Sequence, residues 1–286
     1  MNSSQDFVPL KLSMLQNSNL KIYIKMAQNI VPLEQINSDK NFIKEFVFRN
    51  KDNDNFFFVK KTDLATFLKG ASAQIKKAKT IEDCVTILSA AGEVMFDNLK
   101  MNNLSETSLQ EGFELIQSTV NGDSKQFISA IIQKLSSNKS IGVQSLVRSL
   151  VCFLLAQSLG WQREKNYQNL IIGSILADIG NSFNSEIIHP NNSIAHLGPY
   201  ANNSDISSIV LHHHENFDGS GPLGLTRHKI HPLAKLLRIA DKISLHSNDS
   251  LCHGITFCLA EQRNLYEKEP IFKLLDYMKN KKLLKV

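Results

Sequence analysis

The spacing of apolar residues changes along the chain, from a pattern typical of strands to one typical of helices. Residues 21–26 (KIYIKM) and 56–61 (FFFVKK) are short runs of aromatic and β-branched residues, which favour strands. The polar segment 50–55 (NKDNDN) before the second run is typical of a turn. These patterns predict a small mixed α/β module over residues 1–70.

After about residue 62 the apolar residues recur three and four positions apart, which is typical of helices. Leu64, Phe67 and Leu68 begin this pattern, and breaks rich in Asn, Ser and Gly divide it. Later helices are predicted over 144–160, 166–179, 205–214 and 231–246. We therefore expect an α+β protein, with connecting helices over 71–124 and an all-helical domain over 125–286.

Three of the predicted helices carry ionisable side chains in line with their apolar faces. Asp178 follows Ile171 and Ile175 on one such face, His213 and His214 lie on the next, and Asp241 lies on the last. A carboxylate that faces a core is costly unless it is paired or binds a metal ion. For any one of these residues alone, a misjudged helix boundary or a hydrogen-bonded core side chain is the simpler interpretation.

The distribution of histidine favours the metal interpretation. All nine histidines lie between residues 189 and 253, and histidine is the commonest metal ligand in proteins. Two histidines and two aspartates from three helices predict a site for a divalent transition metal such as Fe, Mn, Ni or Zn.

Composition limits the remaining classes of function. The chain has 286 residues and a formal net charge of +5, which is only weakly basic and does not predict a surface for nucleic acid. No apolar run of about 18 residues and no signal peptide is evident, so we expect no membrane partner and a cytoplasmic protein. The four cysteines form no CxxC pair and have apolar neighbours, which is typical of reduced core thiols.

Two segments carry a resemblance to a known family. HHENFDGSGPLGL (213–225) and IHPLAKLLRIADKIS (230–244) resemble the signature of the HD-GYP domain, a branch of the HD superfamily. LADIGN (176–181) resembles the Leu-His-Asp-Ile-Gly-Lys segment of that family, and the resemblance extends over about 125–260. It implies a helical, metal-dependent domain whose active members hydrolyse the bacterial messenger cyclic di-GMP. The N-terminal part resembles the small regulatory modules that often precede such domains.

The resemblance also assigns roles to individual residues. It implies metal ligands at the positions Asp178, His196, His213, His214 and Asp241, with His189 as the rival of His196 for the ligand in the loop. Glu215 or Asp218 would orient an imidazole N–H, although Asp218 in an Asp-Gly pair is also typical of a plain turn. Arg227 and Lys235 are candidates for binding substrate phosphate, with a solvated basic helix face as the alternative.

Several positions depart from the family pattern. Ala177 replaces the His of the His-Asp pair, Asn181 replaces the Lys that faces substrate phosphate, and Gln144 stands where the first helix should supply a ligand. The turn lacks its Tyr, because Pro222 follows Gly221 directly. The departures imply one metal ion in preference to two and no assignable catalytic residue. We therefore expect a degenerate HD-GYP signalling protein that binds cyclic di-GMP or a protein partner with weak or no hydrolysis. The alternatives are an active metal-dependent cyclic di-GMP phosphodiesterase and a purely structural pairing domain.

Overall fold

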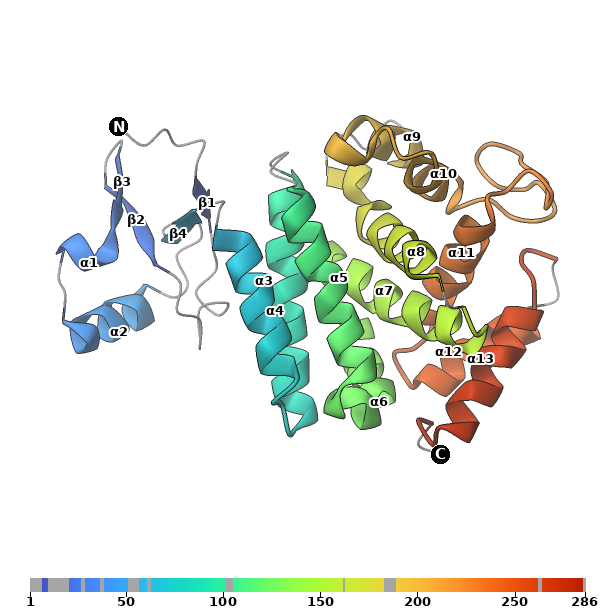
Figure 1. The fold of residues 1–286 in the computed structure, drawn as a ribbon, viewed down its shortest axis with the longest axis horizontal. Coiled ribbons are helices and arrows are strands. Elements are labelled where there is room, and N and C mark those ends of the chain that lie inside the picture. Colours follow the sequence, from blue (N-terminus) through green and yellow to red (C-terminus); the bar gives the residue numbers. More distant parts are fainter. Residues whose placement is uncertain are drawn as a thin grey trace.

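A computed structural model describes most of the chain (Figure 1). The described residues are 7–9, 21–26, 29–36, 39–50, 57–60, 63–100, 105–161, 163–182, 189–261 and 264–284. A small sheet with two helices lies at the N-terminal end, and a body of helices forms the rest, as expected for an α+β protein (Figure 1).

The N-terminal sheet has four antiparallel strands in the order β1-β4-β2-β3. The elements of this region are β1 (Phe7–Pro9), β2 (Tyr23–Met26), β3 (Asn29–Pro32), α1 (Leu33–Ile36), α2 (Lys40–Arg49) and β4 (Phe57–Lys60). The two strands that the sequence predicts, β2 and β4, pair with each other through Tyr23 with Phe58 and Ile24 with Phe57. The predicted turn over 50–55 lies almost wholly outside the described residues.

Helices make up the described chain from residue 63 onward. They are α3 (Asp63–Ile75), α4 (Ile81–Lys100), α5 (Glu106–Asn121), η3 (Asp123–Phe127), α6 (Ile128–Ser136), α7 (Ile141–Ser158), α8 (Glu164–Leu176), η4 (Ile179–Ser182), α9 (His189–Ala195), η5 (Gly198–Tyr200), α10 (Ser204–His212), α11 (Pro232–Leu245), α12 (Leu251–Ala260) and α13 (Glu269–Asn280). The predicted helices over 144–160, 166–179, 205–214 and 231–246 are confirmed as α7, α8, α10 and α11, with ends that differ by a few residues.

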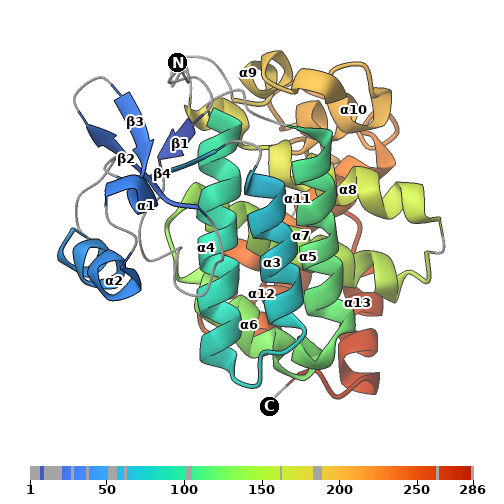
Figure 2. The ribbon, with the colours of Figure 1, turned by 60° about the vertical axis from the view of Figure 1, so that its left-hand side comes forward.

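Helix α7 lies at the centre of the helical body. It packs against α4, α8, α11 and α13, and Figure 2 shows α3, α4 and α5 in front of it. By length and composition it could cross a membrane, but 78% of that 18-residue window is buried inside the protein. Packing on all sides therefore accounts for its apolar character, and its position explains how one charge on this helix can be fully enclosed.

One hydrophobic core connects the sheet to the helices. It extends from Ile24 and Phe57 in the sheet to Leu283 near the end of the chain. Helix α3 crosses residue 70 and packs against α5, and the core includes residues on both sides of residue 124. The division into units at 70 and 124 stays a prediction. The cysteines are free thiols, and Cys84, Cys152 and Cys258 are buried as the sequence predicts.

Candidate metal centre

Asp178 lies on a turn that the neighbouring helix α9 holds in place. The turn joins the end of α8 to η4. The Ser193 hydroxyl on α9 donates to the carbonyl of Ala177 at 2.8 Å and accepts the N–H of Gly180 at 2.9 Å. The Asn192 amide donates to the carbonyl of Gly180 at 2.8 Å. These bonds on both sides of Asp178 fix the direction in which its carboxylate points.

His213 and His214 follow directly after α10, which Asn203 caps by accepting the N–H of Ile206. His213 is fully buried, and its Nδ1 lies 2.6 Å from the carbonyl oxygen of Val210. Because a carbonyl oxygen only accepts, Nδ1 carries the proton and Nε2 carries the lone pair. A hydrogen bond of this kind is the usual support for a histidine that ligates a metal through its other nitrogen.

The three side chains converge on one point. Ligand atoms of Asp178, His213 and His214 all lie within 4.8 Å of one another, and the Nε2 of His213 is 3.9 Å from Oδ1 of Asp178. The imidazole rings of His213 and His214 are 4.0 Å apart between centroids. Two imidazoles and a carboxylate are a donor set that suits a borderline divalent cation, so these residues fit one metal ion.

The other predicted ligands lie outside this group. Among the described residues, neither His196 nor Asp241 contributes an atom to the cluster within 4.8 Å. His196 is half-buried in the segment after α9, and its N–H donates to the carbonyl of Ser193 at 3.0 Å. The side chain of His189, its rival, lies outside the described residues.

His212, the histidine before the pair, points elsewhere. Its Nδ1 accepts the N–H of His231 at 3.2 Å, which ties the end of α10 to the start of α11. Burial and the nearby His231 lower the pKa of His212. His231 in turn caps α11 by accepting the N–H of Leu233. Of three consecutive histidines, two therefore face the cluster and one joins two helices.

A buried arginine on α7 occupies the space between the two aspartates. The Nη1 atom of Arg148 lies 2.6 Å from Oδ2 of Asp178 and 3.2 Å from Oδ1 of Asp241. Its Nη2 donates to the carbonyl of Ser174 at 2.9 Å and to the hydroxyl of Ser145 at 3.3 Å. The side chain is only 3% exposed. One guanidinium thus binds both carboxylates that the sequence assigns to a metal centre.

The charges of this cluster explain why the arginine stays ionised. Burial by itself would lower the pKa of Arg148, but the carboxylates of Asp178 and Asp241 outweigh burial and raise it above its ordinary value. The Nη1 atom of Arg238 also lies 3.9 Å from Oδ2 of Asp241. Two carboxylates therefore face two guanidinium groups, and this part of the centre is close to neutral without any metal ion.

Sequence reasoning did not single out Arg148 and took Gln144 as the position at which the first helix should supply a metal ligand. The amide of Gln144 instead donates to the carbonyl of Ser136 at 3.1 Å and to that of Asn138 at 2.5 Å, in the link before α7. Arg148 lies one helical turn later and faces the aspartates. One feature of the sequence could have indicated Arg148: it is the single charged residue of Ile141–Ser158.

Glu215 and Asp218 both organise the glycine-rich turn. The carboxylate of Glu215 is buried and accepts the N–H of Leu223 at 2.8 Å and that of Leu225 at 2.7 Å. Asp218 accepts from the N–H and the hydroxyl of Ser220 at 3.0 and 2.6 Å. Gly221 lies so close to Glu215 that a Cβ would stand 2.6 Å from its Cα, which explains why the turn needs a glycine there.

The two predicted phosphate-binding residues both lie close to the ring of Phe217. The guanidinium of Arg227 is 5.4 Å and the Nζ of Lys235 is 5.2 Å from the ring centroid. Arg227 also forms an exposed ion pair with Glu267. The structure thus brings these two cations to the same aromatic ring, and one of them, Arg227, is also paired with a carboxylate.

The substituted family positions lie next to Asp178. Ala177 is fully buried, and Asn181 is exposed, with its amide 3.4 Å from Oδ1 of Asp178. A neutral amide therefore stands beside the carboxylate where the family pattern has a lysine.

Comparisons with known proteins find similarity for part of this centre and for the fold. Residues 181–250 match the family described as "HD domain", a segment that includes His213, His214 and Asp241 but neither Arg148 nor Asp178. Among solved structures the chain is similar to "Bd1817, a HDG"Y"P protein from Bdellovibrio bacteriovorus", with a TM-score of 0.64 and 18% sequence identity over 96% of this chain and 100% of that chain. A search of curated proteins gives no match.

Proposed function

We propose that this chain, whose residues 181–250 match an HD-domain family and whose fold is similar to that of an HD-GYP protein, is a cytoplasmic signalling protein that binds cyclic di-GMP or a protein partner with little or no hydrolysis. The observation that carries this proposal is the position of Arg148. Its guanidinium contacts Asp178 and Asp241 together, at 2.6 and 3.2 Å.

A two-metal centre hydrolyses phosphodiesters by holding both ions about 3.5–4 Å apart, so that the attacking and leaving oxygens are each stabilised. The resemblance assigns Asp241 to one of those ions and has both ions share Asp178. In this chain Arg148 binds both carboxylates, and a divalent ion beside the guanidinium would meet a like charge in a buried setting. The donor set at this position therefore does not fit a second ion.

One ion fits at the remaining position. Asp178, His213 and His214 would hold it, with His196 as the proposed fourth ligand. When bound, such an ion supplies a Lewis acid for phosphate oxygens. The chain's own residues orient this set: the carbonyl of Val210 fixes the tautomer of His213, and the guanidinium of Arg148 lies 2.6 Å from the carboxylate of Asp178.

The chain offers few groups for the remaining tasks of hydrolysis. The neutral amide of Asn181 cannot balance charge on a phosphate, and Pro222 has no N–H to donate. Loss of one preorganised donor in an active site typically costs about 10²–10³ in rate, and several losses compound. Binding without turnover is the consequence that we propose, with Arg227 and Lys235, which both lie close to the ring of Phe217, as the phosphate-binding cations.

Titration and hydrolysis assays of the full chain test the proposal. Calorimetry with cyclic di-GMP should give heat that weakens in Arg227→Ala and Lys235→Ala, and chromatography should detect little or no product. Rapid hydrolysis by the unmodified protein would contradict the proposal and favour a phosphodiesterase that works with the cluster of Asp178, His213 and His214. Absence of heat would leave only a protein partner, to be sought by co-purification.

Metal analysis tests the ligand assignment. His213→Ala should reduce bound metal to near zero, because it removes a buried ligand. His228→Ala is the matched control, since His228 is exposed on the glycine-rich turn. Equal metal content in the two variants would reject the assignment.

Replacing Arg148 and adding histidine ligands provides the sharpest test of the role of Arg148 in excluding a second metal ion. Arg148→His with Ala177→His should raise the metal content by one ion per chain, because it frees both carboxylates and adds two ligands. Gln144→His is the matched control: it adds a histidine one turn earlier on the same helix, where the side chain contacts Ser136 and Asn138. An equal rise in the control would refute the role given to Arg148.

A further inference from the structure

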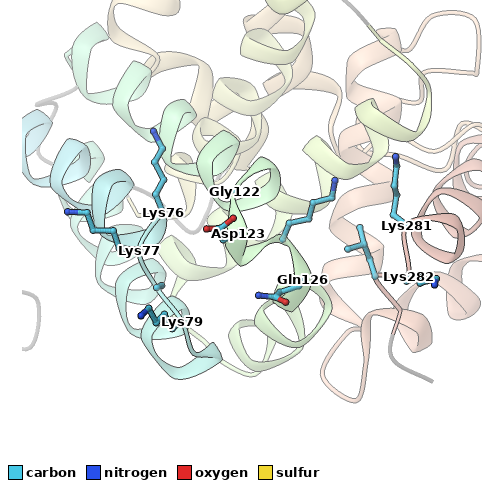
Figure 3. A pocket seen from close by; sticks show the side chains of 11 residues that line it. Lys76, Lys77, Lys79, Gly122, Asp123, Gln126, Lys281 and Lys282 are labelled. Carbon is cyan, nitrogen blue, oxygen red and sulfur yellow. The ribbon is translucent and has the colours of Figure 1, made fainter.

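A basic groove lies at the end of the molecule opposite the candidate metal centre. It has a volume of about 750 Å³ and is formed by the link after α3, by Gly122, Asp123, Lys125 and Gln126, and by the segment after α13. Figure 3 shows Lys76, Lys77 and Lys79 on one side and Lys281 and Lys282 on the other, with Asp123 between them. In Figures 1 and 2 this end carries the C-terminus, whereas α9 and α10 lie at the other end.

The net charge of the residues that line the groove equals the net charge of the whole chain. Six lysines and one aspartate line the groove, which gives a net charge of +5. The formal net charge of the 286 residues is also +5. The rest of the chain is therefore neutral as a whole. Within the part of the chain that the structure describes, none of the six lysines has a carboxylate partner within ion-pair distance.

Helix ends offer a simpler explanation for some of these lysines. Lys76 and Lys77 follow the end of α3, and Lys281 and Lys282 follow the end of α13. Cations near a helix C-terminus interact favourably with the helix dipole. Lys79 and Lys125 do not follow a helix end in this way, because Lys79 precedes α4 and Lys125 lies within η3.

The backbone of Lys282 argues for a role of its side chain beyond the helix end. Lys282 has φ of +54° and is the only described residue other than glycine with a positive φ. Its neighbour closes the helix end, since the N–H of Leu283 donates to the carbonyl of Met278 at 2.8 Å. Glycine is the usual residue at this position, because a Cβ is strained there. A lysine thus stands at a position where helix stability alone favours glycine.

The chemistry of the lining selects a class of ligand. A phosphate group carries about −1.5 to −2 charges, so two or three phosphates match the net charge of the groove, whereas a carboxylate side chain carries only one. The described lining contains no aromatic residue on which a nucleobase could stack. A second hollow of about 400 Å³ shares Lys76, Gly122 and Asp123 and adds the polar side chains Gln117, Ser118 and Asn121.

We propose that this lysine groove, lined by Lys76, Lys77, Lys79, Lys125, Lys281 and Lys282, binds a small ligand that carries two or three phosphate groups. The volume is in the range of small-molecule sites. The site is separate from the candidate metal centre and does not depend on the function proposed for it.

Charge-reversal variants of the full chain test the proposal. Calorimetry with inorganic tripolyphosphate should give binding that weakens as salt increases. Lys76→Glu and Lys282→Glu should each weaken it by roughly tenfold or more. Lys165→Glu is the matched control, because Lys165 is exposed on α8 outside the groove and the change in net charge is the same. ATP in a parallel titration distinguishes a nucleotide from an inorganic source of the same phosphate chemistry.

The outcomes that overturn the proposal are equally specific. Absence of heat with both phosphate compounds would reject it, and so would equal losses in Lys165→Glu and Lys76→Glu. Tighter binding of a hexaglutamate peptide than of tripolyphosphate would reject the phosphate ligand in favour of an acidic protein segment.

Lys282→Gly separates binding from helix stability. Glycine relieves the strain at φ of +54°, so the midpoint of thermal unfolding should rise by roughly 2–4 °C. The same variant should bind tripolyphosphate more weakly, because one ammonium group is lost. A lower midpoint with unchanged binding would show that the lysine serves the helix end alone.

Discussion

The two ends of the helical body use positive charge in opposite ways. At one end Arg148 is enclosed and bound by two carboxylates, and at the other end six lysines face solvent around a groove with one aspartate. A guanidinium that is taken out of water must be matched by nearby negative charge, whereas an ammonium in water need not be. The paired charge of Arg148 therefore stabilises the fold, whereas the charges of the six lysines are available to bind a ligand.

The largest effect on the free energy of unfolding is expected at Arg148. Arg148→Met should lower the free energy of unfolding by about 3–5 kcal/mol, because it removes the buried guanidinium that contacts both carboxylates and leaves Asp178 without that partner. Chemical denaturation followed by circular dichroism measures the change.

A compensated variant sharpens this test. Arg148→Met combined with Asp178→Asn and Asp241→Asn should recover most of the loss, since neither carboxylate charge then remains without Arg148. If the triple variant were as unstable as the single one, packing of the Arg148 side chain, and not its charge, would hold the centre together.

An intermediate effect is expected at the glycine-rich turn. Glu215→Gln should cost about 1–3 kcal/mol, because only one oxygen remains to accept the N–H groups of Leu223 and Leu225. Hydrogen exchange should show faster exchange of one or both of these amides. Unchanged protection of both amides would mean that the turn does not depend on Glu215.

The exposed ion pair on the same turn should matter less. Arg227→Ala should change the free energy of unfolding by about 0–1 kcal/mol, because its pair with Glu267 lies in water, with side chains 53% and 37% exposed. Any effect should shrink as salt is added. A larger loss that persists at high salt would indicate that packing of Arg227 against Phe217 dominates.

The smallest effect on stability is expected at the lysine groove. Lys76→Ala should change the free energy of unfolding by no more than about 0.5 kcal/mol, since its ammonium group is exposed. Thermal unfolding beside the parent chain measures this. A marked loss would place Lys76 among the residues that hold the fold and would break the contrast between the two ends.

The helical spacing of apolar residues predicted those residues of the centre whose positions depend only on their own helix. Asp178, His213 and His214 each lie in line with an apolar helix face, and such a face points to the core whatever the neighbouring helices are. The signature around Glu215 likewise predicted the domain type, because a tight glycine-rich turn needs particular residues in sequence.

The role of Arg148 depends on how helices cross, which spacing does not reveal. Helix α7 is buried on nearly all sides, so its apolar pattern does not distinguish the face of Gln144 from that of Arg148. The two residues are one turn apart, and the crossing of α7 with α8 and α11 decides which reaches the aspartates. Asp241 was predicted as a metal ligand, and in the structure its carboxylate lies 3.2 Å from the guanidinium of Arg148, on a helix far away in sequence.

The cation that contacts both Asp178 and Asp241 is part of the chain itself. A bound ion exchanges with solution, so a protein that depends on one responds to metal supply and to chelators. Arg148 cannot dissociate, and through Ser174 and Asp241 it joins α7 to α8 and α11. The junction of these three helices should therefore keep its shape in cells starved of metal, when an enzyme with two exchangeable ions would lose both its activity and part of its internal support.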